Sequence, residues 1–184
     1  MKTTIIAALV SLCFCASMSA ADTVKSVWVG DRYFELVPWT GTWDAAKADA
    51  ESKGGRLACI KDATTNNSIF NNLVKGGSIK TIYWGGYLID GKWSLIDGTI
   101  MQYKNWNPGQ PNDKSGAIAF QPNPLRPTWN NVPTNHVYPN SGYILELTRE
   151  QYNTRNAKIA LPAPMPAIRP TPATASTQTT PGHI

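Results

Sequence analysis

The clearest strand and turn signals lie in Ile82-Tyr83-Trp84-Gly85-Gly86-Tyr87-Leu88, followed by Asp90-Gly91 and Trp93-Ser94-Leu95-Ile96. Aromatic and apolar residues fill both segments, and such residues are enriched in strands. The Asp-Gly pair between them is a strong signal for a tight hairpin turn. We therefore predict a buried strand over residues 82–88 and a returning strand over residues 93–96.

Two helices are predicted ahead of this hairpin. Thr42 is a suitable N-cap for a helix over residues 43–53, which Gly54-Gly55 would end. A second helix follows Asp62, with its apolar side facing the core. Short alternating or apolar runs predict further strands at residues 27–29, 32–37, 56–60, 116–120, 129–132 and 142–147.

Long loops separate the later strands. Residues 105–112 are rich in Asn, Pro and Gly, and residues 121–127 contain three prolines, so neither segment can continue a strand. Early helices followed by short strands and long loops are typical of an α+β domain. We expect two helices flanking small antiparallel sheets, with one long exposed loop.

The two ends of the chain differ from its middle. Lys2 and the apolar run at residues 5–16, followed by small residues, are typical of an export signal that is too short to span a bilayer. The last part is rich in Pro, Ala and Thr, and such segments stay disordered. We expect a signal peptide at residues 1–21, a folded domain at 22–149 and a disordered tail at 150–184. The mature protein is expected to be secreted or in the cell envelope (periplasm), without a transmembrane segment.

Charge and motifs narrow the function classes. The chain carries 17 basic and 12 acidic residues without a basic run, so nucleic-acid binding is not expected. The sequence has no metalloprotease, serine hydrolase or phosphate-loop motif. No pair of acids suits glycoside hydrolysis. We therefore predict a binding module rather than an enzyme, and the seven Trp and seven Tyr are residue types that recur in binding surfaces.

Segments spread over residues 27–147 resemble, in order, those of C-type lectin-like domains. They are Trp43-Asp44-Ala45-Ala46, Gly54-Gly55-Arg56-Leu57-Ala58, Tyr83-Trp84-Gly85-Gly86-Tyr87, Trp93-Ser94-Leu95-Ile96-Asp97-Gly98, Tyr103-Lys104-Asn105-Trp106 with Gln110-Pro111-Asn112, Trp129-Asn130-Asn131, and Gly142-Tyr143-Ile144-Leu145-Glu146. The resemblance implies a compact double-loop domain whose first and last strands pair. It also implies non-catalytic recognition by the loop near Gln110, in this family often of sugars through a bound calcium ion.

The framework cysteines of that family are absent. Ala50 and Leu145 stand where the resemblance places one disulfide, and Ala119 stands where a second would begin. Cys59 is the single cysteine left after signal removal, so no disulfide can form within one chain. We expect apolar packing to replace the bridges and Cys59 to be a small core residue rather than a reactive thiol. This disulfide-free pattern resembles bacterial members more than animal ones.

The calcium site of the family is only partly kept. The resemblance places the metal ligands at Gln110, Asn112, Asn130 and Asn131. All four are neutral amides, Ala117 falls where an acid is expected, and Asp113 is the only acid between residues 105 and 145. Calcium prefers about six to eight oxygen ligands, several of them usually carboxylates. No cofactor is therefore certain, and any Ca²⁺ is expected to be held weakly.

The ligand-binding residues that we predict are Gln110, Asn112, Asp113, Asn130, Asn131 and Trp106. Pro111 lies where the family commonly has a cis bond, which would aim the amides on either side outward. Amides offer both donors and acceptors, which suits sugar hydroxyl groups. Trp106 either stacks on an apolar sugar face, as Tyr138 could, or packs beneath the loop, which we favour.

Three hypotheses on the partner stay open. The first is recognition of a glycan by the Gln110-Pro111-Asn112 loop, with or without calcium. The second is an adhesin-type module that binds a cell-surface or extracellular protein on the same scaffold without metal. The third is a structural envelope module with the tail as its tether.

Overall fold

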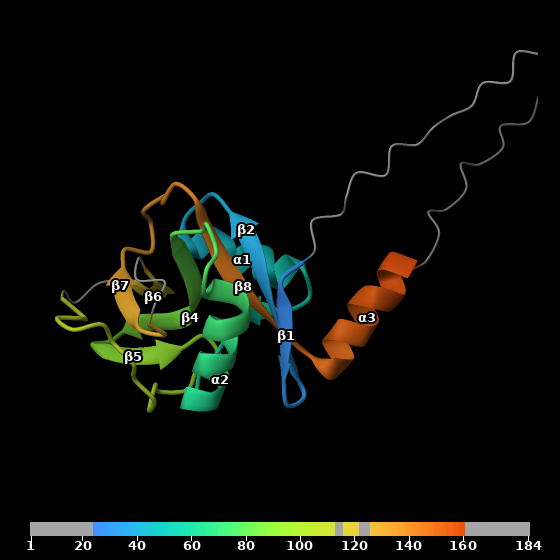
Figure 1. Cartoon of the computed structure of the whole chain (residues 1–184), viewed down its shortest axis with the longest axis horizontal. Coiled ribbons are helices and arrows are strands. Elements are labelled where there is room, and N and C mark those ends of the chain that lie inside the picture. Colours follow the sequence, from blue (N-terminus) through green and yellow to red (C-terminus); the bar gives the residue numbers. More distant parts are fainter. Residues whose placement is uncertain (1–23, 113–115, 122–125, 161–184) are drawn as a thin grey trace, which may run out of the picture.

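The computed structural model describes residues 24–112, 116–121 and 126–160. Its elements in chain order are β1 (Ser26–Val29), β2 (Arg32–Trp39), α1 (Trp43–Ser52), β3 (Arg56–Leu57), α2 (Ala63–Ile69), the π-helical turn η1 (Phe70–Val74), β4 (Thr81–Ile89), β5 (Lys92–Leu95), β6 (Ala117–Phe120), β7 (Trp129–Val132), β8 (Ser141–Thr148) and α3 (Arg149–Ala160). In Figure 1, α1 and α2 lie against the strands of the domain body, whereas α3 extends away from it beyond β1.

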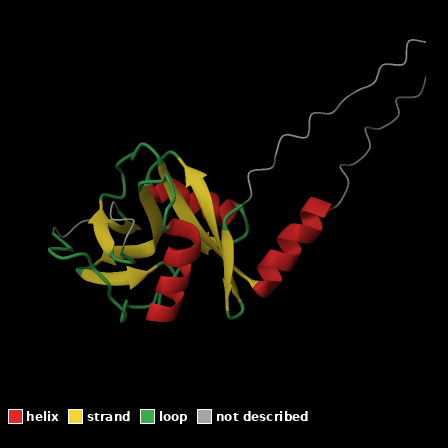
Figure 2. Ribbon diagram, in the orientation of Figure 1, coloured by secondary structure: helices red, strands yellow, loops and turns green. Residues whose placement is uncertain are grey.

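The strands of the described residues form one mixed sheet. Its order is β1-β2-β8-β4-β6-β7, with β3 paired to β8 and β5 paired to β4 off this path. β2 pairs with β8 from Arg32↔Thr148 to Trp39↔Ser141, so the last strand pairs with the second strand and not, as the resemblance implied, with the first. On its other side β8 runs parallel to β4, so these two strands join β1 and β2 to β6 and β7. Figure 2 shows the strands in yellow within the domain body. The α+β class is confirmed, but the small antiparallel sheets that we predicted are one continuous sheet.

The predicted strand over residues 82–88 lies within β4, between β8 and β6 in this sheet. The backbone N of Gly85 donates to the carbonyl oxygen of Ala58 at 2.8 Å. A Cβ at residue 85 would lie 2.9 Å from the carbonyl oxygens of Leu57 and Ala58, so this close approach requires glycine. Asp90 and Gly91 form the predicted turn with φ of 49° and 72°, as a type I′ hairpin needs.

Both predicted helices begin at the expected caps. Oγ1 of Thr42 accepts a hydrogen bond from the backbone N of Ala45 at 3.1 Å and caps α1. The carboxylate of Asp62 accepts from the backbone N of Thr65 at 2.7 Å and caps α2. Caps of this kind satisfy N–H groups that the first helical turn leaves without partners.

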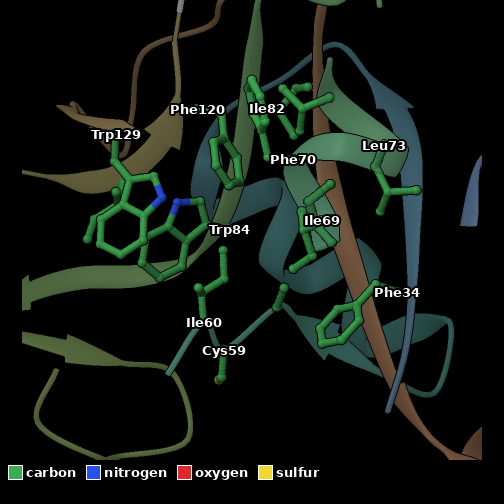
Figure 3. Close-up of a cluster of buried hydrophobic side chains, with 14 of the residues drawn as sticks. Phe34, Cys59, Ile60, Ile69, Phe70, Leu73, Ile82, Trp84, Phe120 and Trp129 are labelled. Atoms are coloured by element: carbon green, nitrogen blue, oxygen red, sulfur yellow. The ribbon is translucent and has the colours of Figure 1, made fainter. Parts of the chain in front are cut away.

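Two apolar clusters fill the two faces of the sheet. Neighbouring residues of a strand point to opposite faces, so Tyr83 lies in one cluster and Trp84 in the other. α1 covers the face of Tyr83, whereas α2 and η1 cover the face of Trp84. Figure 3 shows the Trp84 cluster, in which the ring centroids of Trp84 and Trp129 lie 4.7 Å apart. Trp129 thereby fixes β7, which carries two of the predicted ligand residues, to the core.

Apolar packing occupies the places of the missing disulfides, as we predicted. Ala50, Ala119 and Leu145 are fully buried in the same cluster. Cys59, the one cysteine among the described residues, is a buried free thiol. Burial raises the pKa of this thiol to about 12.

The strand predicted over residues 56–60 is shorter than expected, because β3 ends at Leu57. The carboxylate of Glu146 accepts a hydrogen bond from the backbone N of Cys59 at 2.7 Å, and Nη2 of Arg32 donates to the carbonyl oxygen of Cys59 at 2.5 Å. Side chains thus satisfy the backbone at residue 59, and regular pairing with β8 stops although residues 58–60 stay buried.

The disordered tail predicted from residue 150 is wrong for its first part, because residues 149–160 form α3. The backbone N of Thr148 donates to Oε1 of Gln151 at 2.8 Å, and the backbone N of Gln151 donates to Oγ1 of Thr148 at 3.2 Å. This reciprocal pair is a capping box, which starts a helix directly after β8. The rest of the tail and the predicted signal peptide lie outside the described residues. No helix in the described ranges combines the length and the apolar character needed to cross a membrane.

Candidate functional site

The predicted ligand loop, residues 105–112, lies between β5 and β6 and is fastened to β7. The backbone N of Asn107 donates to the carbonyl oxygen of Trp129 at 2.8 Å, and the backbone N of Trp129 donates to that of Asn105 at 3.0 Å. In Figure 1, β6 and β7 lie at the end of the domain far from α3. The loop therefore meets the asparagines that follow Trp129.

The Gln110-Pro111 bond is cis, as the resemblance implied. The side chain of Asn112 is exposed, which agrees with the predicted outward direction. Gln110 differs, because it is only partly exposed and its Oε1 is buried without a hydrogen-bond partner among the described residues. The two amides beside Pro111 therefore do not face solvent equally.

The structure brings the loop and the two asparagines of β7 together. Oδ1 of Asn131 accepts a hydrogen bond from the backbone N of Asn112 at 3.1 Å. Oδ1 of Asn130 accepts one from Nδ2 of Asn107 at 2.5 Å. Asn131 is buried and Asn130 is partly buried, so β7 supports the loop tip more than it faces solvent.

Four residues of this polar site were not predicted from the sequence: Asn107, Thr128, Gln121 and Thr81. Oγ1 of Thr128 donates to Oδ1 of Asn107. At the far side, Nδ2 of Asn130 donates to Oε1 of Gln121 at 3.2 Å, and Nε2 of Gln121 approaches Oγ1 of Thr81 at 3.4 Å. Only Asn107 could have been predicted as part of the site, because it is an amide in the same loop, three residues before Gln110.

The aromatic candidates for sugar stacking pack against other rings. Trp106 lies with its ring centroid 4.9 Å from that of Trp93 and 6.0 Å from that of Trp129, both edge-on. The ring centroid of Tyr138 lies 4.5 Å from that of His136. Trp106 therefore takes the packing position that we favoured. Asp113, the one predicted acidic ligand residue, lies outside the described residues.

The described residues do not fit a calcium ion. The side-chain carbonyl oxygens of Asn130 and Asn131 already accept hydrogen bonds from the protein. Ala117, where the resemblance placed an acid, is fully buried in β6. Within the described ranges no three His, Cys, Asp or Glu side chains lie close enough together to hold a metal. Asn130 and Asn131 are therefore poor ligands for a hard cation, and although Oε1 of Gln110 accepts no hydrogen bond among the described residues, it is a neutral amide oxygen and not the carboxylate that calcium prefers.

A cavity of about 800 Å³ lies elsewhere, between α3 and the body of the domain. Tyr33, Tyr152 and Arg155 are among its lining residues, and none of the predicted ligand residues is. This cavity was not predicted, because residues 150–160 were expected to be disordered. Helix α3, which contributes many of the cavity's lining residues, lies at the end of the domain opposite β7 (Figure 1).

Comparison with known proteins agrees with this architecture. The family model described as "Lectin C-type domain" matches residues 40–140. The type-2 ice-structuring protein of Brachyopsis segaliensis is 37% identical over 95 residues, which are 50% of this chain and 53% of that protein. The galactose-specific lectin nattectin of Thalassophryne nattereri is 33% identical over 86 residues, which are 45% of this chain and 54% of that protein. The chain thus spans about half the length of these relatives.

Solved structures show the same fold. A calcium-independent type II antifreeze protein superposes with a TM-score of 0.57 at 26% identity, over 67% of this chain and 92% of that one. A C-type lectin from Saxidomus purpuratus superposes with a TM-score of 0.60 at 19% identity, over 67% and 91%. The curated relatives are animal proteins, so they do not support the bacterial character inferred from the missing cysteines. The family is non-enzymatic, in agreement with the prediction of a binding module. The chain belongs to the C-type lectin domain family.

Proposed function

We propose that this chain is a metal-independent recognition domain for neutral, hydroxyl-rich ligands, and for carbohydrates in particular. The ligand would bind at the tip of the ligand loop, where Asn112 is exposed and Gln110 partly exposed. One observation carries the proposal: every predicted ligand residue described in the loop and β7, apart from Trp106, is a neutral amide, and the amides of β7 hydrogen-bond to the loop.

Amide groups suit such ligands because each amide offers both donors and acceptors, as each sugar hydroxyl does. Net hydrogen bonds between neutral groups contribute about 1 kcal/mol each. About three or four of them would give a dissociation constant near 1 mM for a single sugar. A multivalent display of the ligand is therefore the appropriate form for detection.

Two similar proteins support the proposal, one for a sugar ligand and one for the absence of a metal. The nattectin that matches at 33% identity is described as galactose-specific. The solved antifreeze protein that matches at 26% identity is described as calcium-independent. Transfer of either property to this chain belongs to the proposal, because the chain covers about half of its curated relatives.

A second candidate ligand is an ice surface. The relative at 37% identity is described as a type-2 ice-structuring protein. An ice surface presents neutral water molecules in a fixed array, each with O–H donors and an oxygen acceptor, and the same amides have the chemistry to contact them. The two candidates differ in a simple measurement, because only ice binding changes the growth of ice crystals.

We also propose that the protein acts outside the cytoplasm. The apolar run at residues 5–16 and the small residues after it support export. N-terminal sequencing of the protein recovered from its native source would test this. A start near residue 21 or 22 is expected, and recovery of the full chain from the cytoplasm would contradict it.

The test of the main proposal is a glycan array probed in excess calcium and in excess chelator. We expect binding of at least one glycan that is equal in both conditions. The double variant Gln110→Ala with Asn112→Ala should lose this binding, whereas Asn135→Ala, an exposed asparagine between β7 and β8, should keep it. Absence of glycan binding together with an effect on ice growth would favour the second candidate. If the chain binds a protein ligand instead, and removal of the glycans from that protein leaves binding unchanged, both candidates are overturned.

A further inference from the structure

We infer that Asn107 is a positioning residue that holds the ligand loop to β7 by hydrogen bonds and makes a metal ion unnecessary for the shape of the site. This inference rests on the proposed function only in taking the ligand loop as the binding surface. Asn107 itself is partly buried, and its role is to fix the segment that ends in Gln110 and Asn112.

The contacts of Asn107 carry the inference. Its backbone N donates to the carbonyl oxygen of Trp129 at 2.8 Å, and its carbonyl oxygen accepts from the backbone N of Gln110 at 2.9 Å. Its Nδ2 donates to Oδ1 of Asn130 at 2.5 Å, and its Oδ1 accepts from Thr128. Asn107 therefore bonds to Thr128 just before β7, to the first two residues of β7, Trp129 and Asn130, and to the backbone of Gln110.

The side chain of Asn107 is one link of a longer chain of hydrogen bonds. Nδ2 of Asn130 donates to Oε1 of Gln121 at 3.2 Å, and Nε2 of Gln121 donates to Oγ1 of Thr81, at the start of β4, at 3.4 Å. Three amides are thus connected in series, with a threonine hydroxyl at each end. Hydroxyl groups donate or accept, so the whole series keeps its bonds if all three amides reverse together.

The base of the loop has separate anchors, so loss of the Asn107 side chain should loosen the tip without unfolding the domain. Nδ2 of Asn105 donates to the carbonyl oxygen of Pro127 at 2.6 Å. Trp106 packs between Trp93 and Trp129. Neither contact involves the side chain of Asn107.

The series of amides gives a specific expectation for an acid at residue 107. Asp in place of Asn keeps two oxygens that can accept from Thr128 and from a reversed Asn130. Gln121 can then reverse as well, and the hydroxyl of Thr81 supplies the last donor. Asn107→Asp is therefore expected to keep the loop in place, whereas Asn107→Leu, of similar size and without hydrogen bonds, is expected to release it.

Hydrogen exchange of the full chain in excess chelator tests this inference without any ligand. We expect the backbone amides of Gln110 and Asn112 to exchange about tenfold faster in Asn107→Leu than in the wild type. Asn107→Asp and the control Asn135→Ala should stay within about twofold of the wild type. Thr128→Val, which removes one end of the series, should accelerate the same amides to a smaller extent. It also keeps the test valid if Asn107→Leu fails to fold.

Three outcomes would overturn the inference. One is wild-type exchange in both Asn107→Leu and Thr128→Val. The second is exchange in Asn107→Asp as fast as in Asn107→Leu. The third is slowing by about tenfold or more when calcium is added to the wild type, because an ion would then hold the loop. If the exchange pattern is as expected and no glycan binds, the proposed function fails alone.

Discussion

The carboxylate of Glu146 in β8 receives two hydrogen bonds from the guanidinium of Arg32 in β2, at 3.0 and 2.8 Å. Arg56 adds a third at 2.7 Å, and the side chain of Glu146 is only 2% exposed. Removing one partner of a buried charged group leaves the others uncompensated. Because both arginines are partly exposed, we expect Glu146→Gln to lower the unfolding free energy by about 2 to 3 kcal/mol.

Urea unfolding measures this loss, with Glu51→Gln as the control. Glu51 pairs with Lys47 on the surface of α1, where both side chains are largely exposed. Such surface pairs contribute less than about 1 kcal/mol. If Glu146→Gln and Glu51→Gln lowered the unfolding free energy equally, the buried carboxylate of Glu146 would contribute no more to stability than an exposed one.

Asp49 in α1 gives a pH-dependent contribution. Burial raises the pKa of Asp49, but hydrogen bonds from Lys53 and from the hydroxyl of Tyr143 outweigh burial and bring the pKa below its ordinary value. The folded pKa is then lower than the unfolded one, so this stabilisation is present above about pH 4 and is lost as the pH falls through the folded pKa. We expect Asp49→Asn to lower the unfolding free energy by about 1 kcal/mol at pH 7 and by less at pH 2.

Melting temperatures of Asp49→Asn and the wild type at the two pH values test this contribution. The exposed Asp44→Asn in the same helix is the control and should show a small difference from the wild type. A difference between Asp49→Asn and the wild type that stays constant as the pH falls would show that the ionised carboxylate is not what stabilises the fold.

Cys59 should be unreactive in the folded protein. Burial raises the pKa of its thiol to about 12, so the thiolate that reacts with alkylating agents is scarce at neutral pH. We expect peptide mapping to find residue 59 unlabelled by iodoacetamide at pH 8 in buffer and labelled in denaturant. Labelling that rises between pH 7 and pH 9 in buffer would point to an ordinary exposed thiol.

Helix α3 contacts the domain body through a small aromatic cluster and through an ion pair between Arg155 and Glu35 at 2.8 Å. It has no buried residue, and the ring of Tyr152 lies 4.5 Å from that of Tyr33 and 5.1 Å from that of Trp28. Isolated helices of about a dozen residues are marginal in water. We therefore expect Tyr152→Ala to speed hydrogen exchange over residues 152–160 with little change in the melting temperature. The exposed Asn153→Ala is the control, and equal exchange in the two variants would contradict this role of Tyr152.

Local signals in the sequence predicted most of the fold. Thr42, Asp62 and the Asp90-Gly91 turn act within a few residues, and the structure has a cap or a turn at each. α3 was missed although Thr148-Arg149-Glu150-Gln151 has the spacing of a capping box, because the Pro-rich composition further on dominated the prediction. The parallel pairing of β4 with β8 joins distant segments and has no local signal.

The candidate site was predicted in part. Residue types identified the amides and the shortage of acids, which led to the expectation of weak calcium binding. The bond between Asn107 and Asn130 spans 23 residues, and that between Thr128 and Asn107 spans 21. Both bonds depend on how the loop runs over β7, which cannot be predicted from the local residue pattern.

Metal-independent binding by the loop tip is tested most directly by titrating a glycan selected on the array into the wild type and into Asn112→Ala. Both titrations are run in excess calcium and in excess chelator. The wild type should bind with the same dissociation constant in both conditions, and Asn112→Ala should bind about tenfold more weakly in both. Loss of wild-type binding in chelator, or full affinity in Asn112→Ala, would contradict recognition by neutral amides.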